Sequence, residues 1–382
     1  MSDLELKLKK ENENPVKKIG IIGMGRIGEA LLTQTLQEIK KFQNLEGLFL
    51  YSKFNAPEKI IYAGDDMLIN AQKSDRTDGI ITQLAPLFPD IPINNFVNRV
   101  QSISELSQEC DTIVVTIGRK EGEGRRREDL TGQYFKDIIE IMDGIGDRNP
   151  RILMVTNPVT PNCLIANLYS KNENPRIFGF TRLDYMRAKY ILNGWLEFRD
   201  IKLRTDLYIV GPHGSGLIVT GVKIDGDKRG YDNHSLRKYF NGTPEHSLED
   251  LSKETAEYGE KTYAIIGPEG SPSSFAAEIL NSLRKMSNSN GRTKDTVALP
   301  VDIGEKCKAG LPLPITPTYV SMPVVYNNGL PSIIPSFNLE KIPVKYKTSL
   351  IRTLMNEQRR IKRYINQNYE DAFSKAATHF RL

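Results

Sequence analysis

The stretch KIGIIGMGRIGEALLTQTLQ, residues 18–37, contains the pattern that decides the fold. A short apolar run at 19–22 leads directly into a glycine-rich hexapeptide, Gly23-Met24-Gly25-Arg26-Ile27-Gly28, after which apolar residues recur at helical spacing. Glycines there permit a tight turn and let backbone N–H groups approach a pyrophosphate at the positive end of a helix. The hexapeptide alone would also fit an ordinary glycine-rich turn. Its position between a strand and a helix predicts a dinucleotide-binding loop.

The same switch between β-rich and helical runs repeats further along the chain. We expect strands at 19–22, 48–51, 112–117 and 152–156, helices at 27–42 and 134–143, and a further helix that starts at Pro161 with Thr160 as its cap. Such alternation is typical of parallel strands joined by crossover helices. It predicts a doubly wound parallel sheet.

Beyond about residue 176 the pattern is less regular and predicts an α+β arrangement. The expected strands are 207–210, 217–224, 297–299, 318–325 and 333–337, and the expected helices are 251–266, 274–286 and a long one from about residue 345. The predicted fold class is therefore α/β, a Rossmann-type doubly wound parallel sheet followed by an α+β catalytic domain. We expect a flexible charged tail at 1–18, a dinucleotide-binding domain at 19–160 and a substrate domain at 161–382.

Composition narrows the function classes. The 382 residues include 52 basic and 47 acidic side chains, a net charge of +5, and 39% of the residues are hydrophobic. This balance disfavours disorder and a nucleic-acid partner. Apolar runs such as 113–117 and 207–210 are too short to span a membrane, so no membrane partner is expected. The three cysteines, Cys110, Cys163 and Cys307, are too few and too far apart for a disulfide scaffold. We expect a soluble cytoplasmic protein.

The residues after the second strand bear on the cofactor. Folds that bind NAD usually end this strand with an acid that accepts hydrogen bonds from the ribose. Here Tyr51 is followed by Ser52 and Lys53. A hydroxyl and an ammonium group suit a 2′-phosphate, so the cofactor is predicted as NAD(P), with NADP mildly favoured. The alternative is that Ser52 begins a loop, Lys53 is solvated, and NAD is bound.

Four later segments identify a family when they are taken together. They are Gly124-Arg125-Arg126-Arg127-Glu128-Asp129-Leu130, Asn157-Pro158-Val159, Leu183-Asp184-Tyr185-Met186-Arg187 and Gly211-Pro212-His213-Gly214. In this order, after the glycine-rich loop, the chain resembles the L-lactate/L-malate dehydrogenase family from about Lys18 to about Gln358. The resemblance implies an NAD(P)-dependent 2-hydroxy acid dehydrogenase with a small 2-oxo or 2-hydroxy acid as substrate. It also implies a homodimer or homotetramer, and no metal ion is expected.

The resemblance assigns roles that the chemistry requires. Reduction of a 2-oxo acid needs a cation for the carboxylate, a proton donor at the carbonyl oxygen and polarisation of that carbonyl. By resemblance, Arg187 is the carboxylate fork, His213 is the acid/base with Asp184 as its orienting carboxylate, and Arg127 is the lid arginine that reaches the carbonyl. Asn157 would orient the carbonyl and the nicotinamide, Thr262 would line the pocket, and Gly118 would contact the cofactor.

The chain also departs from the family pattern. The lid position that selects the substrate's side chain falls on Glu121, where the family has glutamine or arginine, and a carboxylate there would repel a second substrate carboxylate. Ser215 and Thr160 each stand where an aspartate is usual. The substrate is therefore neutral or cationic at its far end, or the lid register is shifted and the protein is a malate dehydrogenase.

Two other classes of function stay open at this stage. One is the related metal-dependent glycosidase group, although no cysteine has a recognisable ligand spacing with a histidine. The other is a non-catalytic binding protein on the same fold. A non-catalytic protein would have no need to retain all four of the residues Arg127, Asp184, Arg187 and His213, which argues against this alternative.

Overall fold

A computed structural model describes the protein at residues 16–42, 44–52, 61–62, 68–69, 76–118, 127–197, 205–214, 216–224, 247–266, 271–287, 291, 293–301, 318–339, 342 and 344–368. Residues 1–15 of the predicted tail and most of the polar stretch at 225–250 lie outside these residues. The tail prediction was wrong at its end, because Val16 is fully buried in the core and Lys18 begins the first strand. The strands are β1 (Lys18–Ile22), β2 (Gly47–Tyr51), β3 (Ile61–Tyr62), β4 (Leu68–Ile69), β5 (Val97–Arg99), β6 (Thr112–Val115), β7 (Arg151–Met154), β8 (Ile177–Phe180), β9 (Thr205–Val210), β10 (Ile218–Ile224), β11 (Lys294–Val301), β12 (Thr318–Asn327) and β13 (Leu330–Ile333). The helices are α2 (Arg26–Gln37), α3 (Arg76–Leu84), α4 (Ile93–Phe96), α5 (Ile103–Glu109), α6 (Arg127–Ile145), α7 (Val159–Tyr169), α8 (Arg182–Glu197), α10 (Leu248–Ile266), α11 (Pro272–Ser287) and α13 (Val344–Asn368), with short 3₁₀ turns at Ile39–Lys41 and Ala85–Leu87.

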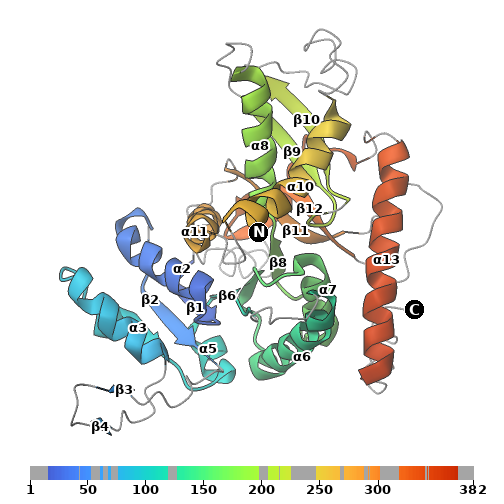
Figure 1. The fold of residues 1–382 in the computed structure, drawn as a ribbon. Helices are drawn as coiled ribbons and strands as arrows, with labels where there is room; N and C mark the ends of the chain where they lie inside the picture. Colours follow the sequence, from blue (N-terminus) through green and yellow to red (C-terminus); the bar gives the residue numbers. More distant parts are fainter. Residues whose placement is uncertain are drawn as a thin grey trace, which may run out of the picture.

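A nine-stranded sheet with the order β13-β12-β11-β8-β7-β6-β1-β2-β5 forms the centre of the molecule. The six strands from β8 to β5 pair in parallel, which confirms the predicted doubly wound sheet. The antiparallel strands β11, β12 and β13 continue the same sheet beyond β8. The sheet continues on both sides of residue 160, and the domain boundary predicted there stays a prediction. The antiparallel pair β9 and β10 lies with α8 and α10 in a part that projects from the sheet (Figure 1).

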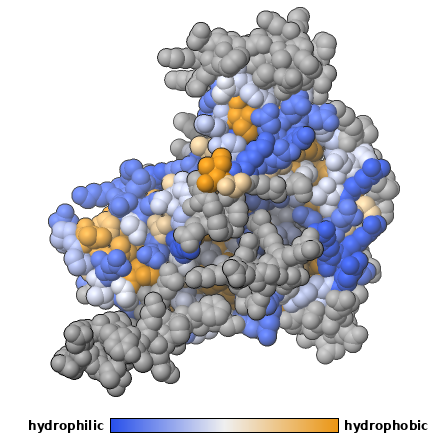
Figure 2. Space-filling view, in the orientation of Figure 1, coloured by the Kyte–Doolittle hydropathy of each residue, from blue (hydrophilic) through white to orange (hydrophobic). Residues whose placement is uncertain are grey.

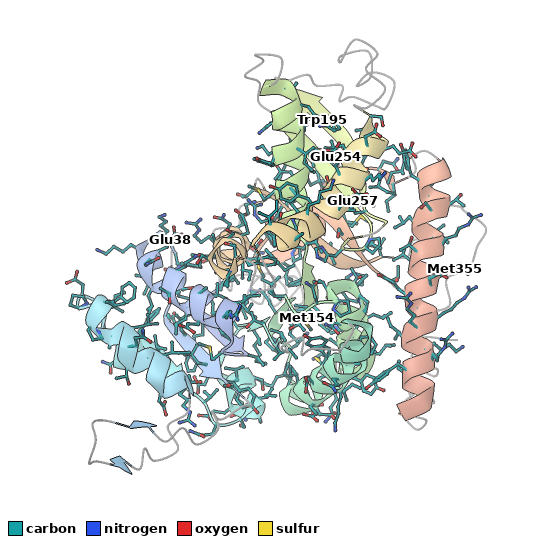
Figure 3. All side chains as sticks on the ribbon, in the orientation of Figure 1. Glu38, Met154, Trp195, Glu254, Glu257 and Met355 are labelled. Carbon is teal, nitrogen blue, oxygen red and sulfur yellow. The ribbon has the colours of Figure 1, made fainter. Side chains whose placement is uncertain are left out.

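Both faces of the parallel strands are buried, so neighbouring residues of one strand enter different cores. On β7, Leu153 packs into the core under α2 and α11, whereas Ile152 and Met154 pack into the core under α6 and α7. Met154, only 1% exposed, lies deep in the molecule in Figure 3. This double burial explains why the strands read as continuous apolar runs in the sequence.

A buried ion network attaches α8 to the sheet. The Arg182 guanidinium donates to Glu278 Oε2 on α11 at 2.5 Å and to Asp295 Oδ1 on β11 at 2.8 Å. The Asp295 side chain is fully buried, and its other oxygen accepts bonds from Ser282 at 2.8 Å and Tyr326 at 3.0 Å. Four elements of the chain therefore meet at one carboxylate.

The start of α7 differs from the sequence expectation. The helix begins at Val159, its N-cap is Pro158, and no side chain caps it. Thr160 is already inside the first turn, where its hydroxyl cannot cap the helix. That hydroxyl instead donates to Glu357 on α13 at 3.4 Å. The predicted Thr160 cap was therefore wrong.

The surface of the described residues carries few large apolar side chains. Leu87, Tyr190 and Ile265 are the large hydrophobic residues exposed there. Figure 2 shows hydrophobic areas as separate spots among hydrophilic ones on the face it displays. In the part of the chain that the structure describes, no helix combines the length and the apolar character that a membrane crossing needs.

The ion network yields a stability prediction. Asp295→Asn removes the fully buried one of the two anions that face Arg182, and this anion also lies 3.5 Å from Lys285, so we expect a loss of about 3–5 kcal/mol in the free energy of unfolding. The matched control is Asp78→Asn. It breaks the Asp78–Arg99 pair at 2.7 Å, whose side chains are 46% and 30% exposed, and should lose less than about 1 kcal/mol. Urea unfolding of both variants measures the difference, and equal losses would contradict the structural role given to Asp295.

Candidate active site

The glycine-rich loop is tightly packed around Gly28 and has free space beside Gly25. A Cβ built on Gly28 would lie 2.2 Å from the Gly23 carbonyl oxygen, so helix α2 can approach the loop only without a side chain there. A Cβ on Gly25, the N-cap of α2, would meet no atom within 4 Å. Thr116, after β6, holds the loop by donating its hydroxyl to the Gly23 carbonyl at 2.7 Å. The open position beside an uncapped helix N-terminus fits a pyrophosphate.

The other residues of the predicted cofactor site have different surroundings. Met24 is 2% exposed and belongs to the core, whereas Arg26 is exposed. Ser52 follows β2 directly, and Lys53 lies outside the described residues. Gly118 is exposed, and a Cβ on it would also meet nothing within 4 Å.

The parallel register gathers these loops at one edge of the sheet. Ile22 at the end of β1 is level with Tyr51 on β2 and with Val115 on β6, and Val115 is level with Met154 on β7. The segments that follow these four residues therefore start side by side, at the carboxyl edge where parallel sheets bind dinucleotides. Asn157, which comes shortly after β7, belongs to this edge.

The side-chain oxygen of Asn157 is an unpaired polar atom among the described residues. Its Oδ1 atom is buried and has no hydrogen-bond partner among the described residues. Buried polar atoms are nearly always bonded, so an exception needs an explanation. A ligand amide or hydroxyl at this edge would satisfy the atom, which agrees with the role that the resemblance implies for Asn157.

The structure brings Asp184 and His213 into direct contact. The Nδ1 atom of His213 lies 2.7 Å from Oδ2 of Asp184, whose side chain is 1% exposed. Asp184 is in the first turn of α8, and His213 is in the turn between β9 and β10. Backbone bonds between Gly211 and Ser321 of β12, at 2.8 and 3.3 Å, tie this turn to the large sheet. The imidazole is thus oriented at Nδ1 and is 24% exposed, as an acid/base group requires.

Arg187 lies beside this pair on the same face of α8. Its Nη1 atom is 3.4 Å from Oδ1 of Asp184, and its side chain is 19% exposed. A Cβ on Gly259 of α10 would lie 3.2 Å from Nη1 and 3.3 Å from Nη2 of Arg187. The sequence analysis did not single out Gly259 as a spacer, although a glycine inside a helix is a signal for a close approach.

Four residues that the sequence analysis named have no described contact with this pair. Thr262 donates its hydroxyl to the Tyr258 carbonyl of its own helix at 2.8 Å. The backbone of Arg127 begins α6, but its side chain lies outside the described residues, as do Glu121 and Ser215. Among the described residues, no three His, Cys, Asp or Glu side chains are grouped as a metal site.

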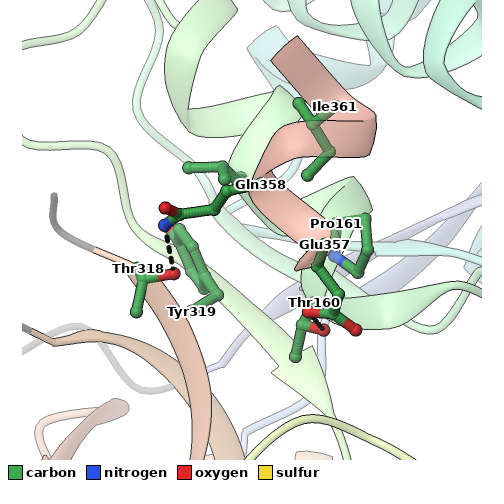
Figure 4. Close-up of a pocket in the computed structure, with 8 residues that line it drawn as sticks. Thr160, Pro161, Thr318, Tyr319, Glu357, Gln358 and Ile361 are labelled. Atoms are coloured by element: carbon green, nitrogen blue, oxygen red, sulfur yellow. Dashed lines mark hydrogen bonds between the residues drawn. The ribbon is translucent and has the colours of Figure 1, made fainter. Parts of the chain in front are cut away.

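Glu357 on α13 is a residue that the sequence analysis missed. Figure 4 shows its carboxylate beside Thr160, in a small pocket between α7, β12 and α13. Burial raises the pKa of Glu357 to about 7, and the Thr160 hydroxyl, Arg360 and His213 oppose this rise. No local sequence pattern reports such a contact, because it joins residues that are distant in the chain.

Comparison with known protein families finds a match for the first part of the chain. Residues 17–179 match the family described as "lactate/malate dehydrogenase, NAD binding domain". This segment is similar to the NAD-binding domain of that family. The resemblance inferred from the sequence motifs is thereby confirmed for residues 17–179, and the glycine-rich loop lies within the matched segment.

Individual relatives agree with this assignment. The malate dehydrogenase of Aliarcobacter butzleri is 23% identical over 56% of this chain and 61% of its own length. The malate dehydrogenase of Natronomonas pharaonis is 24% identical over 50% of this chain and 64% of its own length. The chain thus spans less than two thirds of either curated relative.

Solved structures extend the likeness in fold. The Plasmodium falciparum malate dehydrogenase has a TM-score of 0.68 at 18% identity and covers 91% of this chain and 99% of its own. An Eimeria maxima lactate dehydrogenase, solved with NADH and oxamate, has a TM-score of 0.67 at 14% identity and covers 93% of this chain and 97% of its own. The chain therefore has the Rossmann-type fold of these enzymes.

The two loop glycines make a paired test. Gly28→Ala would push a methyl group into the Gly23 carbonyl, and we expect a loss of about 1–3 kcal/mol in the free energy of unfolding. Gly25→Ala should change that free energy by less than about 1 kcal/mol but weaken NADH binding, because its methyl group enters the open space. Thermal unfolding without ligand and an NADH fluorescence titration separate the two effects. Unchanged NADH binding by Gly25→Ala would contradict the assignment of this space to the cofactor.

Proposed function

We propose that the protein is an NAD(P)-dependent 2-hydroxy acid dehydrogenase. The observation that carries this proposal is the 2.7 Å contact between His213 and the buried Asp184, with Arg187 next to it. A proton donor and a carboxylate-binding fork, placed together, are what reduction of a 2-oxo acid requires. The family of residues 17–179 supports the same activity.

The proposed mechanism uses the protein's own groups as follows. Arg187 binds the substrate carboxylate, which brings the 2-oxo carbon to the imidazole. His213 donates a proton from Nε2 to the carbonyl oxygen, and Asp184 stabilises the imidazolium before the transfer. Arg127 would polarise the carbonyl from the lid, and Asn157 would orient it. The nicotinamide cofactor supplies or accepts the hydride.

Finer assignments are proposals as well. A preference for NADP(H) is supported by Ser52 and by the absence of an acid at that position, whereas the family's description names NAD. A cytoplasmic location agrees with Cys110 and Cys163 being buried free thiols. A homodimer or homotetramer and the division into domains at residue 160 rest on the resemblance.

The first test replaces the proton donor. His213→Asn should lower kcat for 2-oxo acid reduction by roughly a thousandfold or more, because the asparagine side chain cannot donate the proton. In the wild type, reduction should fade as pH rises and the imidazole loses its proton, and oxidation of the hydroxy acid should fade as pH falls. Nicotinamide absorbance with NADH and with NADPH measures both rates and the cofactor preference. Normal turnover by a His213→Asn variant that still binds cofactor would exclude the mechanism.

The substrate's far end is tested at Glu121. Glu121→Arg should raise kcat/KM for oxaloacetate relative to pyruvate, because the change removes a repulsion and adds a fork for the second carboxylate. The alternative, a malate dehydrogenase with a shifted lid, predicts that the wild type already prefers oxaloacetate and that another lid cation binds it. The matched control is Glu123→Arg, the same change two residues further along the lid. An equal effect of both variants would show that overall lid charge, and not position 121, selects the substrate.

A further inference from the structure

The turn that carries His213 contains three glycines. Gly211, Gly214 and Gly216 have φ values of 116°, 86° and 98°, which glycine adopts without the steric cost that other residues have there. The same freedom makes such a turn flexible. An imidazole carried by it keeps one position only if other parts of the chain hold the turn. The contacts of the turn therefore decide how precisely His213 is placed.

The two ends of the turn meet in a narrow neck, where Gly211 lies against Gly216. A Cβ built on Gly211 would lie 2.7 Å from the Gly216 carbonyl oxygen. Gly211 also forms the two backbone bonds with Ser321 that attach the turn to β12. Such bonds lie in the plane of an antiparallel pair, whereas a Cβ points out of that plane. The bonds to β12 therefore hold the neck within this plane but not perpendicular to it.

Helix α13, the red helix in Figure 1, supplies a contact in the second direction. The Cβ built on Gly211 would lie 3.3 Å from Cδ1 of Leu350. A Cβ built on Gly216 would lie 3.0 Å from both Cγ2 and Oγ1 of Thr353. Leu350 and Thr353 are three residues apart, so they lie on one face of the helix. Both ends of the neck thus rest on the same face of α13.

The surroundings of the two α13 side chains make this contact firm. Leu350 is fully buried, and it belongs to the same apolar core as Val210, where β9 ends, and Ile218, where β10 begins. Thr353 is half-buried, and its hydroxyl donates to the Ser349 carbonyl of its own helix at 3.1 Å. That bond fixes the orientation of the side chain that faces the neck.

Helix α13 is also anchored away from the turn. Leu354 packs into the same core as Leu350, and Ile361 and Ile365 pack into the core under α6 and α7. The ring of Tyr364 meets the ring of Phe135 on α6 edge to face, with centroids 5.1 Å apart. A helix that is held at several points along its length can support a flexible turn.

We propose that Leu350 and Thr353 are positioning residues that hold the neck of the His213 turn, so that the imidazole stays where it can transfer a proton. The value of that position rests on the proposed function, whereas the support of the turn by α13 does not. Arg187 belongs to α8 and not to the turn. Loss of the support should therefore slow proton and hydride transfer more than it weakens binding of the substrate carboxylate.

Hydrogen exchange of the full chain, followed by mass spectrometry, tests the support without any use of activity. In Leu350→Ala and in Thr353→Ala, the peptide that covers the neck should exchange roughly tenfold faster than in the wild type, because the turn opens more often. Thr353→Val keeps the shape of the side chain and should exchange like the wild type. The matched control is Ile365→Ala, which truncates a buried residue of the same helix in the other core and should leave this peptide unchanged.

Single-turnover oxidation of NADH tests the positioning. The substrate is pyruvate or oxaloacetate, whichever the wild type reduces faster. The rate should fall roughly tenfold or more in Leu350→Ala and Thr353→Ala, because a small displacement of a reacting group costs a large factor in rate. The KM of the 2-oxo acid should change less than about twofold, because the carboxylate fork is intact. Thr353→Val and Ile365→Ala should keep the wild-type rate.

The outcomes separate the inference from the proposed function. Unchanged exchange of the neck in both alanine variants, or equally faster exchange in Ile365→Ala, overturns the inference whatever the enzyme does. Thr353→Ala alone decides the matter if Leu350→Ala does not fold. Faster exchange in a protein that reduces no 2-oxo acid supports the support by α13 and contradicts the proposed function. Faster exchange with an unchanged rate of NADH oxidation in an active enzyme overturns the positioning role.

Discussion

The buried carboxylate of Asp184 is the group on which the site depends. An anion that is 1% exposed is unstable without cationic or hydrogen-bonding partners, and here they are His213 and Arg187. One partner comes from its own helix and the other from the turn between β9 and β10. Helix α8 must therefore stay packed on these strands, and a separate apolar core does this, with Ala188 and Leu192 of α8 against Leu207 and Val219. The core and the ion contacts depend on each other.

The N-terminal residues of α8 contact two different sets of partners. Arg182 points into the network with Glu278 and Asp295, which fastens the helix to α11 and β11. Asp184 and Arg187, three residues apart, share another face and form the site. The projecting part of the molecule and the nine-stranded sheet are thus joined within one helical turn of the candidate catalytic residues. His213 is thus attached to the sheet through its contact with Asp184 on α8 and through the backbone bonds between Gly211 and Ser321.

The sequence was sufficient for features that local patterns encode. Strands β1, β6 and β7 are buried on both faces, so their continuous apolar runs predicted strands. The family motifs indicated the pair of Asp184 and His213. It was not sufficient for the position of β11 to β13, because a strand's composition does not name its partner. Helix α5 was missed although its signal, a serine followed three residues later by a glutamate, was present. The N-cap Ser102 accepts from the Glu105 amide at 3.0 Å, and Glu105 accepts from the amide of Gln101, the residue before the cap. The Thr160 cap failed because a tertiary contact with α13 used the hydroxyl instead.

Position 160 also connects the sequence departures to the structure. The resemblance implies an aspartate after Asn157-Pro158-Val159, and this chain has a threonine whose hydroxyl meets a carboxylate from α13. The carboxyl group beside the first turn of α7 thus comes from a helix almost two hundred residues away in the chain and not from α7 itself. The aspartate of the family pattern would stand in the first turn of α7, the helix that follows the cofactor edge. The carboxylate on α13 shares its helix with Leu350 and Thr353, which lie against the two ends of the His213 turn.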